Sequence, residues 1–155
     1  MRTTMMAGVA ALTLLLPVVA DAHVSIMPRQ STHGATEKYT IRIPTEGKVA
    51  TVGADIGFPE GVIVEAIQAP AGWKYEVKRQ DDRIVSMTIQ AEVKPYEFIE
   101  VGFVARNPRS GARIVWKLSQ RFADGTVTDW TNAPDGVLRP TAITQLAPAA
   151  ARATR

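Results

Sequence analysis

Apolar and polar residues alternate along most of the chain after residue 36. A period of two is typical of β-strands that bury one face and expose the other. No stretch after residue 22 shows the period of an amphipathic helix. Six alternating runs stand out, and their apolar members are Tyr39, Ile41 and Ile43; Val52, Ala54, Ile56 and Phe58; Trp73, Tyr75 and Val77; Val85, Met87 and Ile89; Ile99, Val101 and Phe103; and Ile114, Trp116 and Leu118.

Turn-forming residues separate these runs. The strongest hairpin signal is Asp124-Gly125, which precedes a last predicted strand from Thr126 to Trp130. Glycine accepts the positive φ that tight hairpin turns need. Short strands joined by such turns predict a β-sandwich, in which two packed sheets bury the apolar residues between them.

The first 22 residues have the features of a secretory signal peptide. Arg2 supplies a positive start, Met5 to Ala20 carries no charge, and Ala20-Asp21-Ala22 fits the small-x-small cleavage rule. The uncharged run is shorter than the ~20 residues of a membrane-spanning helix, which argues against an anchor. We therefore expect cleavage after Ala22 and a periplasmic or secreted protein.

The length and composition of the chain predict one domain. The chain has 155 residues, no cysteine and a net charge of +3, so disulfides, thiolate metal sites and cysteine nucleophiles are excluded. Lysine and arginine alternate with acidic residues and do not form the basic face that nucleic-acid binding needs. We expect the sandwich to occupy residues 23–138. Residues 139–155 are rich in Ala, Pro and Thr, and we expect a disordered tail without a membrane anchor.

His23 would become the N-terminal residue after this cleavage. Its α-amino group and ring nitrogen Nδ1 would then chelate one metal ion. An amine and an imidazole both lose their protons near neutral pH when a metal competes, and two nitrogens in a tetragonal arrangement suit Cu(II). The alternative is that His23 is a chance residue at a frayed terminus.

Further ligands would have to come from elsewhere in the chain. The other histidine, His33, lies in a polar turn and is typical of a surface loop. Glu97 and Glu100 flank the start of the Ile99–Phe103 run, and their parity places them on opposite faces of the strand, with Glu97 on the core side. Either carboxylate is a candidate ligand or an ordinary solvated charge. Trp130, at the end of the last strand, is equally typical of a sheet-edge aromatic.

Four segments of the chain carry a likeness to a known family. They are the signal ending at Ala22 with His23-Val24 after it; residues 36–46 (TEKYTIRIPTE); Gly72-Trp73-Lys74-Tyr75; and residues 97–103 (EFIEVGF), which lead through Gln120 and Asp124-Gly125 to Trp130. In this order they resemble the YcnI-like family of secreted bacterial copper-binding domains. The likeness covers about residues 23 to 138.

The resemblance implies a cupredoxin- or immunoglobulin-like antiparallel β-sandwich that binds one Cu(II) per chain. In the family, a single-histidine brace holds the copper, a glutamate adds oxygen ligation, and a tryptophan lies close to the metal. By position these roles fall to His23, Glu100 and Trp130. Glu97 is the fallback ligand, because a local shift of the alignment exchanges the two glutamates. Val101 stands where an aromatic residue is commoner.

These observations predict a periplasmic copper(II)-binding protein. We expect a copper chaperone or copper-homeostasis accessory, not an enzyme, that exchanges copper with another periplasmic carrier or transporter. Two alternatives stay open. A copper mono-oxygenase would need a second histidine ring, for which only His33 is available. A metal-free secreted interaction or adhesion sandwich would make no use of His23.

Overall fold

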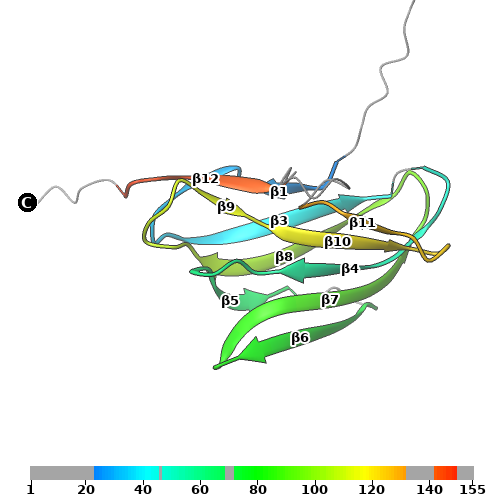
Figure 1. Ribbon diagram of the computed structural model, residues 1–155, viewed down its shortest axis with the longest axis horizontal. Helices are drawn as coiled ribbons and strands as arrows, with labels where there is room; N and C mark the ends of the chain where they lie inside the picture. Colours follow the sequence, from blue (N-terminus) through cyan, green and yellow to red (C-terminus); the bar gives the residue numbers. More distant parts are fainter. Residues whose placement is uncertain (1–22, 46, 69–71, 132–141, 150–155) are drawn as a thin grey trace, which may run out of the picture.

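The computed structural model describes residues 23–45, 47–68, 72–131 and 142–149. Within these ranges the chain forms twelve β-strands and no helix, arranged in three sheets (Figure 1). The predicted signal peptide, residues 1–22, lies outside the described residues. None of the described segments is a helix long and apolar enough to cross a membrane.

A four-stranded antiparallel sheet forms one layer. Its order is β1-β3-β8-β5. Long pairing between β3 and β8 places Thr36 opposite Arg106 at one end and Pro44 opposite Phe98 at the other. The bounds are β1 Ser25–Met27, β3 Thr36–Pro44, β5 Ile63–Ile67 and β8 Phe98–Arg106.

A five-stranded antiparallel sheet forms the second layer, in the order β11-β10-β4-β7-β6. The β6–β7 ribbon lies at one edge of the molecule, and β1 and β12 lie at the other (Figure 1). The bounds are β4 Thr51–Gly57, β6 Lys74–Gln80, β7 Arg83–Val93, β10 Lys117–Phe122 and β11 Val127–Asp129.

A small three-stranded sheet joins distant parts of the chain. It consists of β2 (Gln30–Thr32), β12 (Ile143–Ala147) and β9 (Arg113–Val115). β12 runs parallel to β2 and antiparallel to β9. The sequence predicted disorder throughout residues 139–155, and this is wrong for β12. The backbone of β12 forms hydrogen bonds with β2 and β9, of which β2 is far away in sequence. Ala142, Thr144 and Leu146 are buried.

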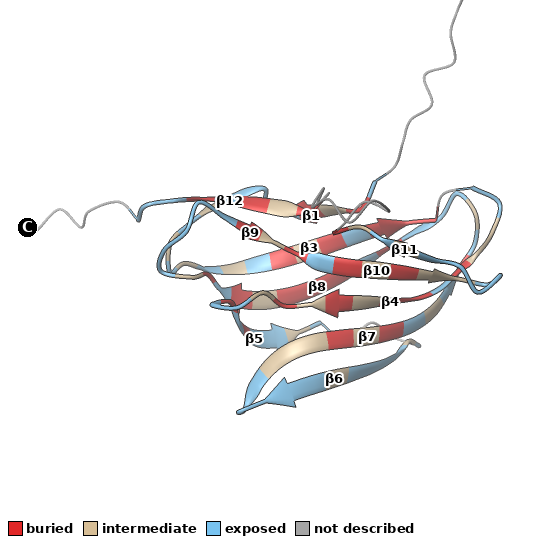
Figure 2. Cartoon of the chain, viewed as in Figure 1, coloured by how far each residue is buried: buried red, intermediate tan, exposed pale blue. Residues whose placement is uncertain are grey.

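The core lies between the two large sheets, as the alternating pattern requires (Figure 2). Four aromatic side chains pack at its centre, with ring centroids 4.7 Å apart for Tyr39 and Trp116 and 5.1 Å apart for Phe58 and Phe103. Burying such rings removes more apolar area from water than any other side chains do. The predicted β-sandwich is therefore confirmed, and so is the Asp124-Gly125 hairpin, where Gly125 has a φ of 85° between β10 and β11.

Candidate metal centre

His23 lies just before β1, at one end of the sandwich. Val24 and Ile26 point into the core, each 1% exposed, whereas His23 is an exposed residue. β1 pairs with β3 through Ser25 and Arg42. Continued by two residues towards the N-terminus, this register sets His23 beside Pro44. The sandwich end that carries His23 is therefore the end where β3 stops and β8 starts.

The ring of Trp130 lies next to the ring of His23. Their centroids are 5.6 Å apart and their planes are tilted by 52°. Trp130 follows β11 directly, and its backbone N–H donates to the Leu118 carbonyl of β10 at 2.9 Å. The backbone of Trp130 is thus held against the five-stranded sheet, while His23 precedes β1 of the four-stranded sheet. β1 and β11 are edge strands of their sheets, so the two rings meet beside these edges.

A buried amide fixes the indole of Trp130. The ring N–H donates to Oε1 of Gln120 at 2.8 Å. Gln120 is 0% exposed, and its Nε2 donates to the Pro44 carbonyl at 2.9 Å and to Thr51 Oγ1 at 2.6 Å. Sequence reasoning assigned Gln120 no role. The sequence does contain a signal for Gln120: it continues the inward-facing series of Ile114, Trp116 and Leu118, yet it is polar.

Glu100 lies on β8, on the outer face of the four-stranded sheet. It pairs with Arg42 on β3, whose Nη2 is 2.8 Å and whose Nε is 3.0 Å from Glu100 Oε1. Both side chains are about half exposed, at 56% for Arg42 and 44% for Glu100. By strand spacing and register, the Cα atoms of His23 and Glu100 are about 12 Å apart. A shared metal would require Glu100 to exchange Arg42 for the metal and the two residues to approach.

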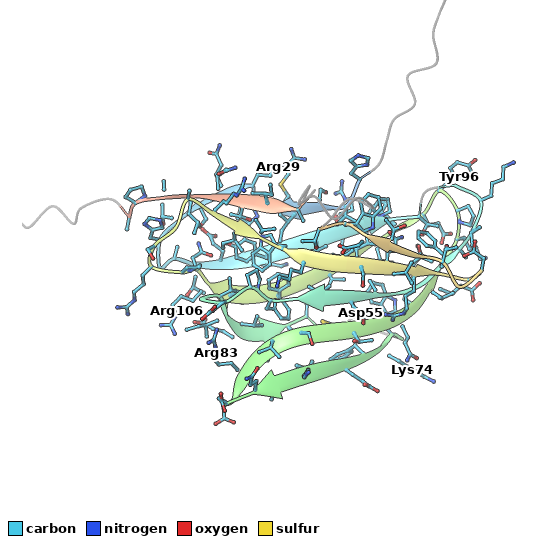
Figure 3. All side chains as sticks on the ribbon, in the orientation of Figure 1. Arg29, Asp55, Lys74, Arg83, Tyr96 and Arg106 are labelled. Carbon is cyan, nitrogen blue, oxygen red and sulfur yellow. The ribbon has the colours of Figure 1, made fainter. Side chains whose placement is uncertain are left out.

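Glu97 precedes β8 and does not lie on the core side, contrary to the expectation from parity. It is exposed because the chain leaves the strand before Phe98. Its Oε2 accepts the backbone N–H of Lys94 at 3.0 Å, which closes the turn around Tyr96. Tyr96 itself is 93% exposed and has a φ of 68°. Figure 3 shows it at the end of the sandwich opposite Arg106.

His33 lies at the other end of the sandwich. It precedes β3, and its Nε2 is 2.8 Å from the Gly111 carbonyl. His23 lies beside Pro44, at the far end of the same nine-residue strand. At the rise of a β-strand, this separates the two histidines by about 25 Å. His33 and His23 therefore cannot share one metal ion in this fold.

His23 and His33 supply the imidazole nitrogens of the described residues, and of the two only His23 has an aromatic ring beside it. Within the described ranges, no group of three or more His, Cys, Asp or Glu side chains could hold a metal ion. A preformed carboxylate-rich site is therefore absent from this part of the chain. The imidazole of His23, with the indole of Trp130 beside it, offers a nitrogen ligand of the type that Cu(II) prefers.

Comparison with known proteins identifies the family to which the chain belongs. A family model described as "Domain of unknown function (DUF1775)" matches residues 23–151. The chain belongs to this family. The match to DUF1775 extends beyond the predicted boundary at residue 138 and takes in β12. It agrees with the resemblance noted from the sequence.

One curated relative is named as a copper-binding protein. The copper-binding protein CutI of Bacillus subtilis (strain 168) is 31% identical over 125 residues, which make up 79% of this chain and 61% of CutI. The DUF1775 chain described here therefore spans less than two thirds of the length of CutI.

Solved structures share the fold. An uncharacterised protein from Nocardia farcinica with an immunoglobulin-like fold has a TM-score of 0.66 and 25% identity, covering 81% of this chain and 98% of that chain. A cohesin module from the family 33 glycoside hydrolase of Clostridium perfringens ATCC13124 has a TM-score of 0.52 and 12% identity, covering 82% of this chain and 98% of the module. The immunoglobulin-like sandwich is thereby confirmed for this DUF1775 domain.

Proposed function

We propose that the protein is exported and binds one copper(II) ion through His23. Cleavage after Ala22 would expose the α-amino group of His23, which then binds together with Nδ1 of the same residue. The contact between the rings of His23 and Trp130 is the single observation that carries this proposal, because it puts an aromatic ring beside the one chelating residue. The similarity to CutI, a copper-binding protein, supports the same proposal.

Glu100 is the proposed carboxylate ligand, with Glu97 as the fallback. Glu100 lies in one cross-strand row with Arg42 and Ser25, and Ser25 comes two residues after His23. Its present partner, Arg42, is half exposed, and an ion pair in water is weak enough to be exchanged. Glu97 is the poorer candidate, since its carboxylate holds the turn through Lys94.

A role in copper handling, without catalysis, follows from this set of groups. Nitrogen and oxygen ligands suit Cu(II), and soft sulfur ligands suit Cu(I). A site built from His23 and a glutamate would release copper on reduction, which a chaperone or homeostasis accessory in the periplasm would exploit in transfer to another carrier or transporter. A mono-oxygenase with two histidine rings at the metal is disfavoured by the distance between His23 and His33.

A metal-free interaction module is the remaining alternative, and a titration distinguishes the two. Protein that starts at His23 is titrated with Cu(II) in the presence of a competing chelator, beside the His23→Ala variant. We expect one Cu(II) per chain for the wild type and loss of tight binding for the variant. Equal binding by both proteins would contradict the proposal.

A further inference from the structure

We propose that Gln120 is a positioning residue, which holds the indole of Trp130 against the imidazole of His23. This inference rests on the proposed copper function for its consequence, but its geometry concerns the protein alone. The amide of Gln120 is fully buried and joins Trp130 to Pro44, the residue beside which His23 lies.

The partners of Gln120 determine the orientation of its amide. An indole N–H can only donate, and a backbone carbonyl can only accept. Oε1 must therefore face Trp130, and Nε2 must face Pro44. A flipped amide would set donor against donor and acceptor against acceptor. The second hydrogen of Nε2 goes to Thr51 Oγ1, so every polar atom of the side chain has a partner.

Among side chains of this length, glutamine alone meets these demands in a neutral form. Leucine and methionine offer neither a donor nor an acceptor. A glutamate carboxylate would accept from Trp130 but could not donate to Pro44, and burying its charge is costly. Protonated glutamic acid keeps one acceptor and one donor, so it reproduces the contact with Trp130 and one of the two contacts of Nε2.

The hydrogen-bond partners of the Gln120 amide come from both layers of the sandwich. Pro44 ends β3 in the four-stranded sheet, whereas Thr51 and Gln120 lie on β4 and β10 of the five-stranded sheet. Thr51 Oγ1 lies 2.8 Å from Thr45 Oγ1, which is 3.2 Å from the Val93 carbonyl of β7. A buried network with all members paired is rigid. The indole is thus tied to the same strand end that positions His23.

The consequence is that the indole of Trp130 would keep a fixed orientation beside a metal ion bound at His23. With its N–H bound to Gln120, the indole cannot turn away from His23 without breaking a buried hydrogen bond. An oriented ring limits which coordination positions of a bound ion water can reach, in the way that outer groups tune metal sites. Loss of Gln120 would free the ring and open that side of the site.

The test compares Gln120→Met with Gln120→Glu and a matched control. Thr144 Oγ1 accepts the indole N–H of Trp116 at 3.1 Å and is likewise 0% exposed. Thr144→Val therefore removes a similar buried hydrogen bond from a different tryptophan. The first readout is solvent exchange of the indole N–H resonances without metal, with the Trp130 signal assigned by its absence in Trp130→Phe.

We expect Gln120→Met to speed exchange of the Trp130 N–H about tenfold, the factor for one lost hydrogen bond. Gln120→Glu should restore slow exchange at acidic pH, where the buried carboxyl is protonated, and Thr144→Val should affect only Trp116. With Cu(II) added at neutral pH, Gln120→Met should alter the copper spectrum, whereas Thr144→Val should leave it unchanged. If Gln120→Met does not fold, Thr51→Val, which leaves the Trp130 contact intact, should show the same change to a smaller extent.

An unchanged exchange rate in Gln120→Met, or in Thr51→Val where the first does not fold, would overturn the role of Gln120. Fast exchange of the Trp130 N–H in the wild type would overturn it too. Failure of the copper proposal looks different. The wild type would then bind no Cu(II), while the exchange data would still report whether Gln120 holds Trp130.

Discussion

The rings of His23 and Trp130 lie 5.6 Å apart, centroid to centroid, and they adjoin strands of different sheets, because His23 precedes β1 and Trp130 follows β11. A Cu(II) ion on His23 should therefore quench the fluorescence of Trp130 far more than that of Trp116, which lies in the core. We expect Trp130→Phe to lose most of the quenching and to weaken binding by about tenfold, the effect of a residue beside the metal and not bound to it. Fluorescence titration with Cu(II) measures both. Undiminished quenching in Trp130→Phe would place the ion elsewhere.

The ion pair between Arg42 and Glu100 offers a test of the carboxylate ligand. If copper binding takes Glu100 from Arg42, then Arg42→Gln releases the carboxylate and strengthens Cu(II) binding, while Glu100→Gln weakens it. We expect a loss of at least about tenfold for Glu100→Gln, because a ligand contributes no less than the outer groups whose loss costs that much. Competitive titration of both variants beside Glu97→Gln provides the comparison. A loss confined to Glu97→Gln would transfer the role to Glu97.

Strand positions could be predicted from the sequence because the buried face is continuous. Ile99, Val101 and Phe103 are at most 8% exposed, as their alternation requires. β12 could not be predicted, since its stability comes from pairing with β2 and β9, which local composition does not reveal. The prediction that Glu97 faces the core was wrong because β8 starts at Phe98, so Glu97 lies outside the strand and does not follow its alternation.

Some residues of the candidate site could likewise be predicted from the sequence, and one could not. The residue types and the cleavage rule single out His23, and the resemblance adds Trp130 and Glu100. The sequence places Gln120 at an inward position of its strand, but its hydrogen-bond partners could be recognised only in three dimensions. Its partners Pro44, Thr51 and Trp130 lie on separate segments, and nothing local in the sequence connects them.

Tyr39 should make the fold sensitive to alkaline pH. Its hydroxyl donates to Asn107 Oδ1 at 2.5 Å, and burial raises the pKa of the phenol above its ordinary value. The folded state therefore keeps a proton that the unfolded chain releases, so stability should fall as pH rises past about 10. Tyr39→Phe should lack this part of the alkaline loss, and should be less stable by about 1 kcal/mol at neutral pH. Urea unfolding of both proteins from pH 8 to 11 measures the difference, and parallel curves would contradict the prediction.

Gly53 should resist substitution. A Cβ there would lie 2.5 Å from Arg121 Nη2 and from the Ile89 carbonyl. Arg121 lies across the strand at this point, donating to the Ile89 carbonyl at 3.1 Å and pairing with Asp55. We expect Gly53→Ala to lower the free energy of unfolding by about 1–3 kcal/mol.

Gly57 on the same strand is the control for this substitution. A Cβ at Gly57 would lie 3.2 Å from Cβ of Lys117, a mild overlap that a shift of a few tenths of an ångström relieves. Gly57→Ala should therefore cost less than Gly53→Ala. Thermal unfolding of the two variants decides the order, and equal losses would show that Arg121 does not occupy the space above Gly53.

The most direct test of the copper proposal is electron paramagnetic resonance of Cu(II) on protein that begins at His23, beside protein with one additional methionine before His23. The extra residue turns the α-amine of His23 into an amide and moves the free amine to the methionine, but leaves the imidazole, Trp130 and both glutamates in place. We predict a stoichiometric type-2 signal with nitrogen hyperfine structure only in the protein that begins at His23. Identical weak spectra from the two proteins would contradict copper binding through His23.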